Sequence, residues 1–157
     1  MNKRGPSRPV VMTLTLFALL GCVAGPTTAG VGRAIAPIPA GLARVWFLQL
    51  FLPEETRATP IISANGVPVA QSQLGGASFR DFPPGTYTFT VPSYGVDTGQ
   101  AQTVQLVAGT QTYLEVQSLR SWEGSGDTAQ RDTLYVRAIS PVWVEKYFPM
   151  LTYFGPR

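Results

Sequence analysis

The residue types that most often carry enzyme chemistry are scarce in this chain of 157 residues, which contains no histidine and one cysteine, Cys22. Histidine is the commonest general base and zinc ligand, and a cysteine thiolate is the nucleophile of cysteine enzymes. Phosphate-binding patterns of the types GxGxxG and GxxxxGK(S/T) are missing too. The sequence therefore excludes the usual serine triads, cysteine-nucleophile enzymes and Cys/His metal sites. We expect no catalytic residue, no metal and no bound cofactor.

Acidic side chains are the remaining candidates for catalysis. A glycosidase needs two carboxylates about 5 to 10 Å apart across a cleft. Glu54 and Glu55 are adjacent in a charged turn, whereas Asp81, Asp97 and Glu115 are isolated in the sequence. We therefore expect no hydrolase.

An acidic loop at residues 123–127, with Asp132 nearby, contains oxygen ligands of the kind that calcium prefers. The loop lacks the spacing of an EF-hand. We expect a solvated loop rather than a calcium site.

The segment before Cys22 has the three zones of an export signal. Lys3, Arg4 and Arg8 are positive, Val10–Leu20 is apolar, and Gly21 is small. A membrane-spanning helix needs roughly 18 or more apolar residues, which this run does not reach. We expect residues 1–21 to be cleaved after export.

The tetrad Leu19-Leu20-Gly21-Cys22 resembles the lipobox of bacterial lipoproteins. The resemblance implies cleavage between Gly21 and Cys22 and a covalent lipid on Cys22, which would hold the protein on a membrane. Val23, where an aspartate would favour the inner membrane, resembles the pattern for release to the outer membrane. The alternatives are an ordinary secretory signal with a chance cysteine, and a buried core thiol.

The net charge of the chain comes from the export signal. The chain has 12 Lys and Arg against 9 Asp and Glu, and loss of Lys3, Arg4 and Arg8 leaves 9 against 9. Because the mature chain has no formal net side-chain charge, we expect no nucleic-acid partner.

Composition divides the chain into four parts: a signal at 1–21, a lipidated N-terminus and flexible tether at 22–40, a β-sandwich domain at 41–140, and an aromatic-rich C-terminal segment at 141–157. The tether is predicted from its Gly, Ala, Pro and Thr content and from its lack of an apolar period. The alternative for this part is an N-terminal strand that packs Val31, Ile35 and Ile38.

Most of the domain reads as strands. Ala43–Leu52 is a continuous apolar run, typical of a strand covered on both faces. Ile61–Ala64 and Val67–Ala70 flank Asn65-Gly66, the dipeptide preferred in a type I′ hairpin turn. Pro68 lacks an amide donor and places the second of these strands at a sheet edge.

Further strands follow at regular spacing. Ser78–Phe82 meets Pro83-Pro84-Gly85, a predicted tight turn with Pro84 and Gly85 at its centre, and Thr86–Val91 then alternates apolar and polar residues. Gln102–Val107 and Gln111–Gln117 are predicted to form a hairpin, and Thr133–Ile139 another strand. We expect an all-β fold, an antiparallel β-sandwich of about seven strands.

The C-terminal segment predicts a short helix, because Ser140 is a good cap, Pro141 suits the first helical position, and Pro149 limits the length. The segment is rich in aromatic residues: Trp143, Tyr147, Phe148, Tyr153 and Phe154. They predict either an aromatic flap that closes one end of the sandwich or a segment that docks a partner or a membrane surface.

Ala43–Phe47, Ala64–Val67 and Phe82–Phe89 together resemble the DUF2846 group of bacterial lipoproteins. The Pro-Gly-x-Tyr element at 84–87 is also similar to that of carboxypeptidase-regulatory-like and PEGA sandwiches. The resemblance covers about Leu42–Leu119. It implies a transthyretin-like sandwich and carries no established activity.

We therefore expect a non-enzymatic lipoprotein of the cell envelope, anchored through Cys22 and facing the periplasm, with an envelope protein as its partner. The alternative function is binding of a glycan or small ligand. One candidate surface for such a ligand is a polar sheet face, formed by Thr86, Thr88, Thr90, Gln100, Gln102, Gln105, Gln111 and Gln117. Strand addition at the edge near Val67–Ala70 is another way to bind a peptide.

Overall fold

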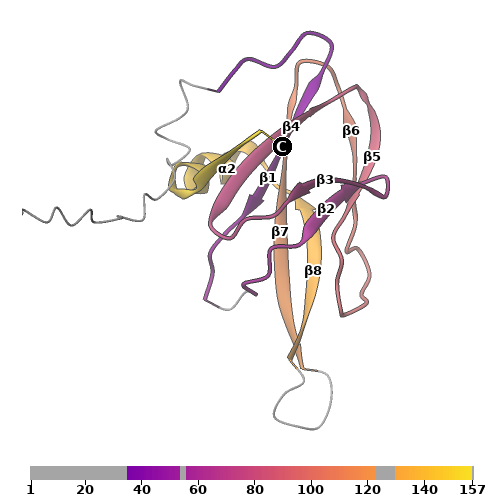
Figure 1. The fold of residues 1–157 in the computed structure, drawn as a ribbon, viewed down its shortest axis with the longest axis vertical. Coiled ribbons are helices and arrows are strands. Elements are labelled where there is room, and N and C mark those ends of the chain that lie inside the picture. Colours follow the sequence, from indigo (N-terminus) through magenta and orange to yellow (C-terminus); the bar gives the residue numbers. More distant parts are fainter. Residues whose placement is uncertain (1–34, 54–55, 123–129, 157) are drawn as a thin grey trace, which may run out of the picture.

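The computed structural model describes residues 35–53, 56–122 and 130–156, which form two β-sheets (Figure 1). One sheet has five strands in the order β8-β7-β1-β4-β9, and the other has four in the order β3-β2-β5-β6. The strands are β1 (Ala43–Gln49), β2 (Ile61–Ala64), β3 (Val67–Gln71), β4 (Gly76–Phe82), β5 (Gly85–Thr90), β6 (Gln102–Leu106), β7 (Gln111–Trp122), β8 (Gln130–Ala138) and β9 (Thr152–Pro156). Helix α2 (Pro141–Tyr147) and the 3-10 turn η1 (Phe148–Met150) lie between β8 and β9. The predicted signal, Cys22 and the predicted tether up to residue 34 lie outside the described residues.

The all-β sandwich that the sequence predicts is confirmed, with two differences of detail. The described residues form nine strands rather than about seven. The pairings β1 with β7 and β4 with β9 are parallel, whereas all others are antiparallel. Parallel neighbours need long connections, and here the intervening strands of both sheets supply them.

Strand β1 is buried along its whole length, as the apolar run at Ala43–Leu52 predicts. Val45 and Phe47 enter the core between the two sheets, where they meet residues such as Phe89. Trp46 and Leu48 point to the opposite face and join a second cluster. Each face of β1 therefore has its own apolar cover.

The strand ends at Gln49, three residues earlier than predicted, because this side chain is tied into the chain that follows. Its amide donates to the Ala58 carbonyl at 3.0 Å, and its Oε1 accepts from the Ser72 hydroxyl at 2.6 Å. Buried polar groups need such partners. Gln49 thus closes the end of β1 without leaving an unsatisfied amide group.

The Asn65-Gly66 turn joins β2 and β3 as predicted. Both residues have positive φ, 50° at Asn65 and 81° at Gly66, which suits the type I′ geometry. The Asn65 side chain also reaches β5, since its Oδ1 accepts from the Thr88 amide at 2.8 Å. The turn therefore helps to align three strands.

The predicted edge position of Pro68 is confirmed, because β3 is the outermost strand of the four-stranded sheet. Val69 has no partner in the pairing of β2 with β3, where the register shifts. Arg80 of β4 donates to the Val69 carbonyl at 3.1 Å. A proline, a bulge and a bonded carbonyl all oppose pairing with another strand, so this edge is poorly suited to bind an extended peptide.

The predicted hairpin of Gln102–Val107 with Gln111–Gln117 is wrong. Strand β6 pairs with β5 in the four-stranded sheet, whereas β7 pairs with β1 and β8 in the five-stranded sheet. Leu106 and Leu114 are both buried in the core between the sheets, so the connection around Gly109 carries the chain from one sheet to the other. The Pro84-Gly85 turn does the same between β4 and β5, with φ of 154° at Gly85.

Loop 92–101 covers the outer edge of β8. The amide of Val136 donates to the Gln100 carbonyl at 3.0 Å. The amides of Leu134 and Ala138 donate to the side chains of Ser93 and Gln102. The edge is therefore occupied by side-chain and backbone partners instead of a tenth strand.

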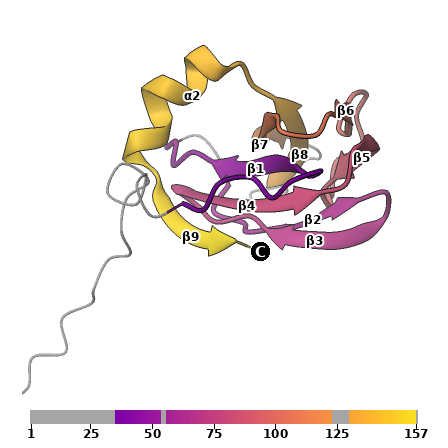
Figure 2. The same cartoon turned by 90° about the horizontal axis from the view of Figure 1, so that it is seen from above.

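The predicted C-terminal helix is confirmed as α2, with Pro141 in its first turn and its end just before Pro149. The Ser140 side chain makes no cap bond, but its carbonyl accepts from the amides of Trp143 and Val144. Figure 2 shows α2 over the five-stranded sheet, on the side away from β2 and β3. No helix in the described ranges is long and apolar enough to cross a membrane.

We predict that Asn65→Ala lowers the free energy of unfolding by about 1 kcal/mol, because it removes the acceptor for the Thr88 amide and disfavours positive φ. Asn65→Asp is the matched control, since it keeps the acceptor and tolerates positive φ. Urea unfolding of the three proteins measures the difference. Equal stability of Asn65→Ala and Asn65→Asp would contradict the proposed role of this side chain.

Candidate functional site

The candidate site lies on the outer face of the five-stranded sheet, the face turned away from the four-stranded sheet. The buried side chains Trp46, Leu48, Ala77, Phe79, Val144 and Leu151 form the outer cluster, and Ile35, Leu50, Tyr113, Ile139, Phe148 and Tyr153 pack against it. Residues from β1, β4, α2 and the N-terminal segment thus meet in one place. The outer cluster forms the buried layer beneath the partly exposed residues of this face.

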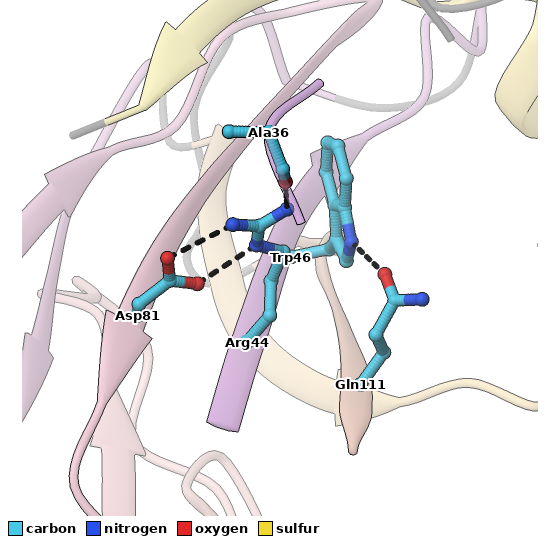
Figure 3. A network of polar contacts seen from close by, with 5 residues as sticks. All are labelled: Ala36, Arg44, Trp46, Asp81 and Gln111. Atoms are coloured by element: carbon cyan, nitrogen blue, oxygen red, sulfur yellow. Dashed lines mark hydrogen bonds and ion pairs between the residues drawn. The ribbon is translucent and has the colours of Figure 1, made fainter. Parts of the chain in front are cut away.

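Trp46 is the centre of the outer cluster. Its ring lies 4.9 Å from Phe79 and 4.8 Å from Phe148, the latter edge-on at 89°. Tyr153 stacks on Phe79 with centroids 6.1 Å apart. The indole Nε1 donates to Oε1 of Gln111 at 2.8 Å (Figure 3). The aromatic rings and the satisfied N–H together fix the indole in one orientation.

Arg44 precedes Trp46 by two residues on the same face, and its charged side chain is buried, with 3% of the residue exposed. Its Nε and Nη2 bond the two carboxylate oxygens of Asp81 at 2.7 and 2.9 Å, and its Nη1 donates to the Ala36 carbonyl at 2.7 Å (Figure 3). The guanidinium carbon lies 3.8 Å from the centre of the Phe79 ring. Arg44 therefore fastens both β4 and the incoming N-terminal segment to β1.

Two hollows lie beside the outer cluster. The first, of about 420 Å³, is formed by the segment 35–38 with Arg44, Gln111, Tyr113 and Phe148. The second, of about 370 Å³, is called the Glu115 groove and is lined by Glu115, Gln117, Arg137, Ala138, Ile139, Ser140 and Trp143. Strand β7 contributes to both, because its alternate residues 111, 113, 115 and 117 face outward.

Glu115 is a buried acid, with 7% of its surface exposed. Its Oε2 accepts from the Gln117 amide at 2.6 Å, and among the described residues it has no ion-pair partner. Burial raises the pKa of its carboxyl, and the Gln117 bond lowers it by less. The groove thus contains a buried carboxyl group that no cation among the described residues pairs with.

A third hollow lies at the other end of α2. It measures about 210 Å³ and is lined by Leu50, Phe51, Leu52, Gly75, Tyr147, Met150 and Leu151. Phe51 and Met150 are 58% and 75% exposed. We call it the apolar hollow, because nearly all its side chains are apolar.

The five aromatic residues of the C-terminal segment divide between these places. Phe148 and Tyr153 pack against the outer cluster, and Phe154 sits close over Gly76 of β4. Tyr147 lines the apolar hollow. Trp143, 56% exposed, lines the Glu115 groove and stacks on Tyr147 at 5.1 Å. Part of the segment covers the sheet, and part of it faces outward.

The residues expected on one polar sheet face lie in three places. Thr86 and Thr88 pair with Gln105 and Thr103 across β5 and β6. Gln100 and Gln102 bond the edge of β8. Gln111 and Gln117 lie on the other sheet, on its outer face. The expectation of one common face is therefore wrong, because the chain changes sheets after β6.

The acidic residues do not form a facing pair in the described structure. Asp81 is bonded to Arg44, and Asp97 accepts from the Tyr135 hydroxyl at 2.6 Å, which lowers the pKa of the Asp97 carboxyl. No group of three or more potential metal ligands occurs among the described residues. The acidic pair at 54–55 and the candidate calcium loop at 123–127 lie outside them.

Sequence reasoning did not single out Arg44 or Arg137 as site residues, assigned Gln111 to a common polar face that does not form, and set Glu115 aside as isolated. One signal was present, since Arg44 is the only charge in the apolar run at 43–52. A charge inside a strand buried on both faces needs a partner. The identity of that partner, Asp81, follows from the register of β1 with β4.

We predict that Arg44→Met lowers the free energy of unfolding by about 3 kcal/mol, because it leaves the Asp81 carboxylate without its partner. Arg80→Met is the control, since Arg80 is exposed on β4 and the loss of its hydrogen bond to the Val69 carbonyl should cost only about 1 kcal/mol. Adding Asp81→Leu to Arg44→Met should recover part of the loss. Chemical denaturation measures the wild type, the single variants Arg44→Met, Asp81→Leu and Arg80→Met, and the double variant. A double variant as unstable as the sum of Arg44→Met and Asp81→Leu would refute the pairing energy.

We predict that Glu115→Gln raises the free energy of unfolding at pH 7. The raised pKa means that the folded state holds the proton more tightly than the unfolded state, so ionised Glu115 destabilises the fold at neutral pH. This cost vanishes as the pH falls below the unfolded value of about 4.3.

Urea unfolding at pH 7 and pH 4 tests this prediction, with the exposed Glu145→Gln as a control for the loss of one negative charge. The advantage of Glu115→Gln should shrink at the lower pH. An advantage that does not change with pH would count against the burial of a charged carboxylate.

Comparison with known proteins gives no assignment for this site: no protein-family model matches the chain, and no curated protein matches it. The likeness of Ala43–Phe47 and Phe82–Phe89 to DUF2846 lipoproteins stays a resemblance of motifs. A function has to be proposed from the residues themselves.

Proposed function

We propose that the protein is a lipoprotein of the bacterial cell envelope, lipidated on Cys22 and facing the periplasm from the outer membrane, and that it acts as a non-enzymatic protein-interaction module. The lipobox-like tetrad at 19–22 and the preceding apolar run support the anchor. The resemblance to a lipoprotein group supports it as well.

The observation that carries the interaction role is the apolar hollow. Exposed Phe51, Leu52 and Met150 surround it, while buried Leu151 forms part of its wall. Exposed apolar side chains on a well-packed base are typical of protein interfaces. An apolar side chain of a partner would fill this hollow and cover Met150.

The position of the N-terminal segment fits an anchored module. Ile35 packs against the outer cluster, and the Ala36 carbonyl is bonded to Arg44. Twelve residues, 23–34, separate Cys22 from Ile35, and the thirteen Cα–Cα steps between the two can span at most about 45 Å. A lipid on Cys22 would therefore keep the domain within that distance of the membrane.

We predict that Cys22→Ser abolishes metabolic labelling with palmitate and blocks cleavage of the precursor, because sulfur is the atom that accepts the lipid. Labelling of the wild-type chain and of the variant in a bacterial host measures this. Palmitate on the serine variant would refute the anchor.

We predict that a photo-crosslinking amino acid at Met150 captures an envelope protein in intact cells, and that Phe51→Ser weakens the capture. The same amino acid at Tyr94, which is 85% exposed on the loop after β5, is the matched control. Point changes are preferable to deletion of the C-terminal segment, which would remove buried Val144 and Leu151. Equal crosslinking from both positions, or none from position 150, would refute docking at the apolar hollow.

A further inference from the structure

We propose that the Glu115 groove binds a saccharide. The groove lies between the outward faces of β7 and β8 and the side of α2 that carries Trp143. It is separate from the apolar hollow, which is lined by none of the same residues. Saccharide binding is therefore a second role beside the protein docking proposed above.

Trp143 supplies an aromatic surface in the groove. Its ring is 56% exposed and is held by stacking on Tyr147, with an angle of 18° between the two planes. Lys146 places its ammonium 4.8 Å from the Tyr147 ring and 5.8 Å from the Trp143 ring. A large aromatic ring fixed in advance loses little entropy on binding, and the C–H face of a sugar ring is a suitable surface to stack on it.

Polar groups stand beside this ring at the spacing of strand neighbours. Glu115 of β7 is opposite Arg137 of β8 in the register, and Gln117 follows two residues along. Opposite residues have Cβ atoms about 5 Å apart, and alternate residues lie about 7 Å apart along a strand. The polar ends of Glu115 and Gln117 are closer, with the Gln117 amide nitrogen 2.6 Å from Glu115 Oε2, so neighbouring hydroxyl groups of one sugar ring could reach both. Ile139 completes the lining with an apolar side chain.

The charges of the groove favour a neutral ligand that both donates and accepts hydrogen bonds. Glu115 would repel an anion, and Arg137 would repel a cation. The Arg137 guanidinium donates to the Gly99 carbonyl and lies 4.6 Å from the Tyr135 ring, so it is held in place by the chain. An apolar ligand would leave the Glu115 carboxylate desolvated without compensation.

A hydroxyl donor would offset the cost of burying the Glu115 carboxylate in this groove. Among the described residues the Glu115 carboxylate accepts a hydrogen bond from Gln117, and a carboxylate has acceptor capacity for several. A sugar hydroxyl that donates to it would form a charge-assisted hydrogen bond. The volume of about 370 Å³ is within the range of small-ligand sites.

The test is a nuclear magnetic resonance titration of the full-length protein, purified in a detergent without a sugar headgroup. The probes are maltotriose, cellotriose and the trimer of N-acetylglucosamine, each up to about 10 mM, a range that covers weak binding. We expect at least one probe to produce saturable shifts of the Trp143 indole N–H and the Gln117 side-chain amide. The dissociation constant should be about 1 mM or lower.

Point variants test whether binding depends on the residues of the groove or on α2 as a whole. Trp143→Ala and Glu115→Gln should each weaken binding about tenfold, through loss of the stacking surface and of a charge-assisted bond. Trp143→Phe should retain most of the binding. Val142→Ala, on an exposed position of the same helix, should not change it.

The absence of shifts with all three probes, or shifts that lie outside the groove, would overturn the proposal. Saturable shifts of the same signals with N-acetyl-lysine amide but with no saccharide would overturn it too, by showing a site for a basic peptide. Because Phe51 and Met150 lie outside the groove, the crosslinking result stands or falls separately.

Discussion

The burial of β1 on both faces is the constraint on which the rest of the structure depends. A strand with Val45 and Phe47 on one side and Trp46 and Leu48 on the other needs two covers. The four-stranded sheet supplies the first. Side chains of α2 and η1 supply the second, together with Tyr153 of the edge strand β9. Burial of about 200 Å² of Trp46 is worth at most about 5 kcal/mol, so the outer cover is an integral part of the fold.

The same constraint accounts for the polar groups of the outer face. Arg44 lies next to Trp46 on a surface that excludes water, so its charge requires Asp81, and its remaining donor takes the Ala36 carbonyl. Glu115 lies on the neighbouring strand under the same cover, and in the described part of the chain its hydrogen-bond partner is Gln117. One buried charge is satisfied internally and holds the structure together. The other is left facing a groove, which is where we infer a ligand.

Local sequence signals predicted the features that depend on a few neighbouring residues. The turn at Asn65-Gly66, the edge position of Pro68, the two-sided burial at Ala43–Gln49 and the helix after Ser140 are all of this kind. Pairings between distant segments were not predictable in this way. Gln102–Leu106 and Gln111–Trp122 look like a hairpin in sequence, but Leu106 and Leu114 enter the core from opposite sheets.

The candidate site shows the same division. The aromatic content of the C-terminal segment marked Trp143 and Tyr147 as candidates. It did not predict which aromatic rings are buried and which are exposed. That depends on the parallel pairing of β9 with β4, which brings Tyr153 beside Phe79. The neighbourhood of Glu115, Arg137 and Trp143 likewise depends on the β7 and β8 register and on the course of α2. No spacing of residues along the sequence predicts that these three side chains are neighbours.

Native-state amide hydrogen exchange tests most directly the claim that the outer cover is part of the fold. The Thr152 amide of β9 donates to the Gly75 carbonyl, and the Arg44 amide of β1 donates to the Thr110 carbonyl. If cover and core unfold together, the two amides should be protected to within about tenfold. Fast exchange at Thr152 and neighbouring α2 amides, with β1 still protected, would show that the cover opens independently and would contradict this account.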